Sequence, residues 1–70
     1  MKNKYEINIF ENMIHIKNYK KICSISDEII CIELFEFLVK IKGKSLIIVG
    51  IDEFEICING LVYNIEFLYE

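Results

Sequence analysis

The sequence predicts an all-β protein of about eight short antiparallel strands, arranged as a curled meander that is sandwich-like or a partly open roll. Three observations predict this class. Apolar and polar residues alternate with a period of two along much of the chain, which is typical of strands with one buried face. Ile, Phe and Tyr are common, whereas the helix formers Ala and Gln are missing. Short polar or glycine-containing turns separate the alternating segments.

Size and composition limit the possible classes of protein. We expect the 70 residues to form a single small domain, residues 1–70. A hydrophobic fraction of 54% exceeds what so small a core can absorb. We therefore expect two covered sheet faces or a partner chain. The chain has no apolar run of membrane-spanning length and no signal-peptide pattern, so we expect a cytoplasmic location.

The first elements are a predicted hairpin. Residues 5–10 and 13–17 both alternate, and Glu11-Asn12 between them suits a tight turn because Asn tolerates positive φ. In the second strand Ile14 and Ile16 are predicted to point inward.

The next elements are less regular. Residues 22–26 predict a weak strand, and the polar residues 26–28 predict a turn. A helix beginning near residue 26 is the competing interpretation. We reject the helix because residues 29–39 are rich in Ile, Phe and Val. Residues 29–34 instead predict a strand that turns at Phe35-Glu36.

Residues 37–60 organise the rest of the predicted fold as three short strands. A two-residue turn at Gly43-Lys44 is predicted to separate the first two, and Gly50 with the residues after it to separate the second from the third. The middle strand contains consecutive apolar residues at 46–49, so both of its faces need cover.

Asn59-Gly60 is the strongest hairpin signal in the chain, because a type I′ turn requires positive φ at both central positions. On the strand before it, Phe54, Ile56 and Ile58 are predicted to point inward. Residues 61–69 are predicted to form the last strand. One face of that strand is apolar and consists of Leu61, Tyr63, Ile65, Phe67 and Tyr69.

Four strand-and-turn motifs follow one another over nearly the whole chain. They are carried by Ile14, Ile16, Asn18, Tyr19 and Lys20; by Ser26, Asp27, Glu28 and Ile30; by Val39, Ile41, Gly43, Lys44, Leu46 and Ile48; and by Glu55, Ile56, Ile58, Gly60, Ile65 and Phe67. In this order and spacing they resemble the YabP/YqfC family of sporulation proteins, and the likeness is closer to the YqfC side. Lys21 departs from the family pattern, which usually has glycine there, and the family's basic N-terminal extension is nearly absent.

The resemblance implies an endospore-forming bacterium and a role in spore development in the mother cell, without catalytic activity. Family members tend to be encoded beside integral membrane sporulation proteins. A membrane-embedded sporulation protein is therefore an implied partner, and the implied location is the mother-cell cytoplasm, at the periphery of the forespore membrane.

The residues themselves predict no catalytic, metal or cofactor site. The cysteines Cys23, Cys31 and Cys57 match no zinc-ligand spacing and are interpreted as small hydrophobes. The single histidine, His15, is predicted to face outward. A Cys–His dyad would require it to meet Cys57 or Cys31 in space.

Two further motifs are interpreted as structural. Gly43-Lys44-Ser45 lacks the preceding glycine and the following helix that a phosphate-binding loop needs. The acidic residues Asp52, Glu53 and Glu55 are interpreted as a solvated turn, since a chain this short leaves little room for a catalytic cleft. No small-molecule substrate is expected.

One basic and aromatic patch offers an alternative function. Lys17, Lys20 and Lys21 surround Tyr19, as in small β-barrels that bind single-stranded nucleic acid. The net charge of −3 and the absence of Arg argue against it. Nucleic acid is therefore not the partner we expect.

The sequence thus favours a non-enzymatic protein that acts by association in spore envelope morphogenesis. The surplus of apolar residues indicates the association, and the family resemblance indicates the setting. The candidate partner face is Ile47, Val49 and Ile51, and the expected partner is a second copy or a membrane-embedded sporulation protein.

Overall fold

The computed structural model describes residues 5–69, which form one open antiparallel sheet of six strands and no helix. The all-β class is confirmed, with fewer strands than predicted. The order across the sheet is β1-β2-β6-β5-β4-β3. The strands are β1 (Glu6–Phe10), β2 (Met13–Lys17), β3 (Lys21–Ile25), β4 (Ile29–Glu33), β5 (Phe37–Ile51) and β6 (Glu55–Tyr69).

Two wrong turn predictions explain the smaller number of strands. Gly43-Lys44 and Asn59-Gly60 lie inside β5 and β6, where the chain continues in the same strand. The β5–β6 register shifts between Lys42 and Gly43, and again between Lys44 and Ile47. The conformational freedom of glycine is therefore used to bend two paired strands rather than to reverse the chain.

The predicted turns at residues 11–12, 26–28 and 35–36 are confirmed, and β4 confirms the rejection of a helix after residue 26. The turn after β5 occupies residues 52–54. The prediction that Phe54 points inward is wrong, since Phe54 belongs to this turn and is exposed. The Asp52 side chain stabilises the turn, because its Oδ1 accepts hydrogen bonds from the backbone N–H groups of Phe54 and Glu55.

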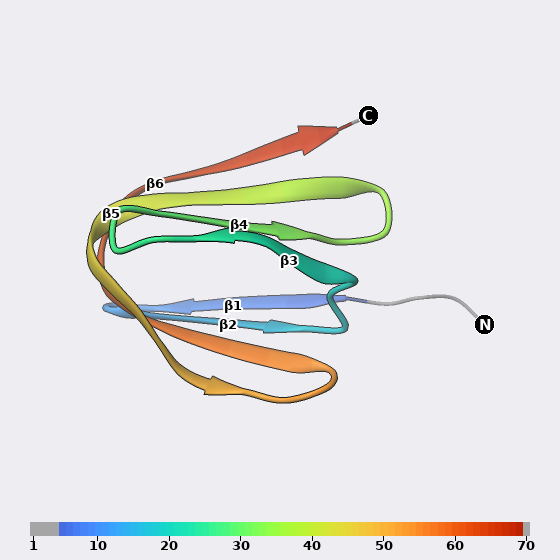
Figure 1. Ribbon diagram of the computed structural model, residues 1–70, viewed down its shortest axis with the longest axis horizontal. Helices are drawn as coiled ribbons and strands as arrows, with labels where there is room; N and C mark the ends of the chain where they lie inside the picture. The colour runs from blue at the N-terminus through green and yellow to red at the C-terminus, as the bar shows by residue number, and fades with distance from the viewer. Residues whose placement is uncertain (1–4, 70) are drawn as a thin grey trace.

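A long central hairpin organises the sheet. Strands β5 and β6 have 15 residues each, and both bend near their middle. Figure 1 shows the sheet folding over at this bend, so that its two halves run back alongside each other. The β1–β2 hairpin pairs with residues 55–59 of β6, and the β3–β4 hairpin pairs with residues 38–42 of β5. Each short hairpin therefore widens a different half of the folded sheet.

The core lies between the two halves and is made mainly of isoleucine. Ile14 and Ile16 of β2 lie directly opposite Ile58 and Ile56 of β6, and all four are buried. The other half contributes residues of β4 and β5 in the same way. Burial of each such side chain stabilises the fold by about 1.5–3 kcal/mol. The buried core is Ile14, Ile16, Ile30, Ile32, Leu34, Phe37, Val39, Ile41, Leu46, Ile56 and Ile58.

The bend depends on two glycines. A Cβ atom at Gly43 would overlap the carbonyl oxygen of Leu61 on the paired strand. A Cβ atom at Gly60, where φ is +142°, would lie 2.8 Å from the carbonyl oxygen of Ser45. Ser45 itself has a positive φ of 57°, and Leu46 next to it is buried. The backbones of β5 and β6 therefore approach so closely at the bend that only glycine fits.

Backbone hydrogen bonds tie the bend to the turns of both short hairpins. These bonds satisfy N–H groups that the irregular register would otherwise leave unpaired. They also fix the bend at one place along the hairpins. The bonds run from Gly43 N to Glu28 O (2.9 Å), from Leu46 N to Asp27 O (2.9 Å) and from Gly60 N to Asn12 O (3.0 Å).

We predict that Gly43→Ala lowers the free energy of unfolding by about 3 kcal/mol, because the added methyl group forces β5 away from β6 at the bend. Gly50→Ala is the matched control, since a Cβ atom there meets only the Cys57 Cβ atom at an ordinary 3.7 Å. We expect the control to change the free energy by less than about 0.5 kcal/mol. Urea unfolding followed by circular dichroism measures both, and equal effects of the two variants would contradict this account of the bend.

Candidate interaction surface

The predicted partner residues Ile47, Val49 and Ile51 lie together in the second half of β5. Their exposed fractions are 55%, 49% and 56%. In the same segment Leu46 is buried and Ile48 is half-buried against the core. The sequence predicts that residues 46–49 need cover on both faces. In the structure one face is buried against the core of the same chain, and the other face is open.

A bulge in β5 separates two of these residues. Ile47 lies opposite Asn59, whereas Ile51 lies opposite the buried Ile56, and the register shifts between Ile48 and Gly50. Directly opposed residues of an antiparallel pair project to the same side of the sheet. Ile47 therefore lies on the outer side, and Ile51 lies at the rim of the core side. The two residues share one strand but not one face.

The way the sheet folds leaves parts of β5 and β6 without a neighbour on one side. Within residues 5–69, β4 pairs with β5 only at residues 38–42, and β2 pairs with β6 only at residues 55–59. We call residues 47–51 of β5 the β5 edge and residues 61–69 of β6 the β6 edge. On one side of each edge the backbone groups therefore face no other strand. Such groups can pair with a strand from another chain.

The β6 edge is a second apolar surface, and the sequence predicted it only as an apolar face of the last strand, not as a partner surface. A signal was present in Tyr63 and Tyr69, because a tyrosine hydroxyl needs a hydrogen-bonding partner or water and so favours a boundary position. The large hydrophobic residues exposed along this edge are Leu61, Tyr63, Phe67, Leu68 and Tyr69.

Aromatic packing holds the end of the β6 edge in place. The Phe37 ring is buried, and its centroid lies 5.1 Å from that of Tyr69 in a stacked arrangement. It also lies 5.9 Å from the Phe67 centroid and 5.2 Å from the Tyr5 centroid, both in edge-on geometry. Such pairs stabilise their arrangement by about 0.5–1.5 kcal/mol beyond area burial. The edge is therefore an ordered strand with one side open.

The structure brings His15 and Cys57 together, as a Cys–His dyad would require. They lie directly opposite each other on β2 and β6, beside a pocket that Gly50 also lines. However, His15 Nε2 lies 3.1 Å from Glu55 Oε1, and among residues 5–69 the Cys57 thiol makes no hydrogen bond. The His15 imidazole thus pairs with a carboxylate next to the thiol. Activation of a nucleophile would need the imidazole to be directed at the sulfur, and it is not.

The other two cysteines lie close together on the β3–β4 hairpin. The β3–β4 register shifts between Ile22 and Ser24, which places Cys23 in the irregular step, and Ser24 lies opposite Cys31. Partial burial raises the pKa of the Cys31 thiol, and the neighbouring Cys23 thiol raises it further. Cys23 is exposed, and its Sγ lies 4.0 Å from Glu33 Oε1.

The basic and aromatic patch is largely occupied by contacts within the chain. Lys17 Nζ lies 3.9 Å from a Glu6 carboxylate oxygen, and Lys20 Nζ lies 3.4 Å from one of Glu33. The Tyr19 ring packs against the core, and its hydroxyl donates to a backbone carbonyl 2.9 Å away. A half-buried ring gives bases little surface on which to stack.

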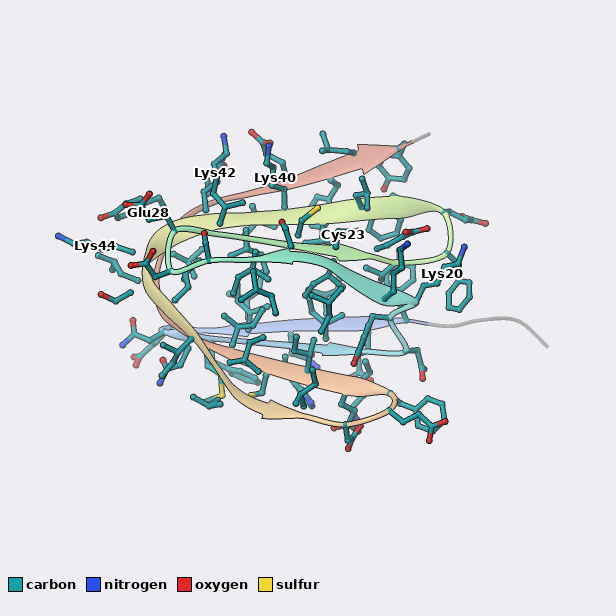
Figure 2. All side chains as sticks on the ribbon, viewed as in Figure 1. Lys20, Cys23, Glu28, Lys40, Lys42 and Lys44 are labelled. Carbon is teal, nitrogen blue, oxygen red and sulfur yellow. The ribbon has the colours of Figure 1, made fainter. Side chains whose placement is uncertain are left out.

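Three further lysines, Lys40, Lys42 and Lys44, lie on β5. Figure 2 shows Lys40 and Lys42 pointing away from the core on the outer side of the strand, and Lys44 projecting at the bend. Lys42 Nζ lies 3.7 Å from Glu66 Oε2 on the neighbouring strand. Gly43-Lys44-Ser45 lies within β5 and precedes no helix, so it lacks the form of a phosphate-binding loop.

Residues 5–69 include no group of three or more His, Cys, Asp or Glu side chains placed to hold a metal ion. The same residues form no helix that is long and apolar enough to cross a membrane.

Comparison with protein-family models, curated proteins and solved structures found no match to this chain. The candidate functional surfaces are the β5 and β6 edges, because they combine exposed apolar side chains with an unpaired side of the strand.

We predict that iodoacetamide at about pH 8 modifies Cys31 several-fold more slowly than Cys23. The raised pKa of Cys31 leaves less reactive thiolate at this pH, and its partial burial limits access. The rates are followed by mass spectrometry of digested protein, and urea-unfolded protein is the control in which the two rates converge. Faster modification of Cys31 in the folded protein would contradict the placement of these two residues.

Proposed function

We propose that the protein is non-enzymatic and acts by protein–protein association in spore envelope morphogenesis. The observation that supports association is the β5 edge, an ordered strand with exposed isoleucine and valine and an unpaired side. The spore setting rests on the sequence resemblance to the YabP/YqfC family. The partner in this proposal is a membrane-embedded sporulation protein or a second copy, met in the mother-cell cytoplasm at the forespore membrane.

Association at the β5 edge has a clear physical basis. A strand added beside residues 47–51 would satisfy the free backbone groups of that edge. It would also remove the apolar surface of Ile47 and Val49 from water, which stabilises a complex by roughly 25 cal/mol per Å². Both contributions use groups that the folded chain leaves exposed.

Binding of single-stranded nucleic acid is the alternative, and the geometry favours it less. Two of the lysines that would contact phosphates lie beside carboxylates of the same chain. The net charge of −3 further weakens attraction to a polyanion.

We predict that deleting the gene in the source bacterium lowers the number of heat-resistant spores, and that a copy carrying Ile47→Lys does not restore it. The charge blocks association at the β5 edge but changes the free energy of unfolding by less than about 1 kcal/mol, since the side chain is exposed. Heat-resistant colony counts measure the effect, with circular dichroism of the purified variant as the check on folding.

Ile25→Lys is the matched control, because Ile25 of β3 is exposed to the same extent as Ile47. We expect this variant to restore spore formation. Normal spore counts after gene deletion would contradict the sporulation role. Full restoration by Ile47→Lys would contradict the β5 edge as the partner surface.

A further inference from the structure

Two cysteines lie next to each other on the β3–β4 hairpin. The bulge in β3 falls between Ile22, which lies opposite Ile32, and Ser24, which lies opposite Cys31. Cys23 is the extra residue of this bulge. A bulge sets two residues of one strand against one residue of its partner, so Cys23 and Ser24 together oppose Cys31. The irregular step of β3 therefore brings Cys23 against Cys31 across the two strands.

The two thiols lie on the same side of the sheet. Glu33 follows Cys31 by two residues on β4 and so projects to the same side as Cys31. Cys23 Sγ lies 4.0 Å from Glu33 Oε1, which places the Cys23 sulfur on this side as well. Ile30 and Ile32 take the other side of β4 and are buried in the core. Both thiols therefore face outward, with Cys23 exposed and Cys31 half-buried.

The distance between the paired strands suits a disulfide. Residues that oppose each other in antiparallel strands have Cα atoms about 4.5–5.5 Å apart. Disulfides span Cα separations of about 4.4–6.8 Å. The thiols also interact with each other. Burial raises the pKa of the Cys31 thiol, and the charge of the Cys23 thiolate and a hydrogen bond between the two side chains raise it further. The sulfur atoms are therefore already close enough to react.

We propose that Cys23 and Cys31 are a redox-active pair, which hydrogen peroxide oxidises to a reversible disulfide across the β3–β4 hairpin. This inference does not depend on the proposed function by association. Cys57 is not part of the pair, because it lies on β6 opposite His15 and Gly50, in the half of the folded sheet that the β3–β4 hairpin does not join.

The exposure of the two cysteines sets the order of the reaction. The exposed Cys23 thiolate attacks one oxygen of the peroxide, the O–O bond breaks, and hydroxide leaves and is protonated to water. Cys23 is then a sulfenic acid. The Cys31 sulfur attacks the Cys23 sulfur, an S–S bond forms, the S–O bond breaks, and the leaving hydroxide takes up the Cys31 proton as a second water. Two thiols are oxidised, and one peroxide is reduced to two waters.

The disulfide would fix an edge strand of the sheet. β3 has one neighbouring strand, β4, and the pairing between them is interrupted at the bulge. On the core side Ile22 of β3 packs against the buried cluster. A covalent bond at the bulge holds β3 to β4 where the hydrogen-bond ladder is weakest, so oxidation should slow the local opening of this edge. The pair is thus a site at which an oxidant changes the stability of one hairpin.

The first test identifies the linked cysteines in the full chain. Reduced protein is treated with a small excess of hydrogen peroxide, alkylated with iodoacetamide, and digested with a glutamate-specific protease, which cleaves after Glu28 between the two cysteines. Mass spectrometry should show Cys23 linked to Cys31 and Cys57 alkylated, and dithiothreitol should restore both thiols. The matched control Cys57→Ser should form the same link. Free thiols at residues 23 and 31, or equal linkage to Cys57, overturn the proposal.

The second test uses only the wild-type chain and so does not depend on the folding of a variant. The equilibrium constant for the Cys23–Cys31 disulfide is measured in glutathione redox buffers, for the folded protein and for protein unfolded in urea. We expect the constant to be at least about tenfold larger in the folded protein, because the hairpin holds the two thiols together. Equal constants in the two states overturn the proposal, since the fold would then contribute nothing to the pairing.

Discussion

The close approach of β5 and β6 at Gly43 and Gly60 is the constraint on which the rest of the structure depends. A flat six-stranded sheet of this sequence would expose its isoleucine face to water, and the described residues include no helix to cover it. The bend solves this by folding the sheet onto itself, so that isoleucines of β2 and β6 pack against those of β4 and β5. One sheet thereby supplies both layers of the core, which suits a chain too short to build a second sheet.

The same bend creates the candidate functional surfaces. The β1–β2 hairpin pairs with β6 in one half of the central hairpin, so the other side of β5 stays unpaired there. The β3–β4 hairpin pairs with β5 in the other half, so the other side of β6 stays unpaired there. These sides are rich in Ile, Val, Tyr and Phe, although acidic and basic residues are available elsewhere in the chain. Exposed apolar residues on an ordered, unpaired strand are typical of surfaces that bind another chain. The fold and the proposed association surfaces are therefore linked, because the constraint that forms the core also leaves the edges open.

Much of the fold could be predicted from the sequence, and the predictions that were wrong share one physical origin. Alternation correctly placed Ile14, Ile16, Ile56 and Ile58 in the core, because the period of two reports directly on which side of a strand is buried. It could not distinguish a glycine that reverses the chain from one that bends it, since both need the same backbone freedom. For the same reason Ile47 and Ile51 were assigned to one face, whereas the bulge at residues 48–50 places them on opposite sides. The open β6 edge depends on which strands are neighbours, and no local pattern encodes that order.

Amide hydrogen exchange of the wild-type protein tests the central claim most directly, namely that the bend leaves one side of β5 and one side of β6 unpaired within the chain. The account predicts that amides of residues 47–51 that face away from β6, and amides of residues 61–69 that face away from β5, exchange quickly in dilute protein. Amides between β4 and β5 should be protected, because those strands pair within the chain. Slow exchange along both edges in dilute protein would contradict the account.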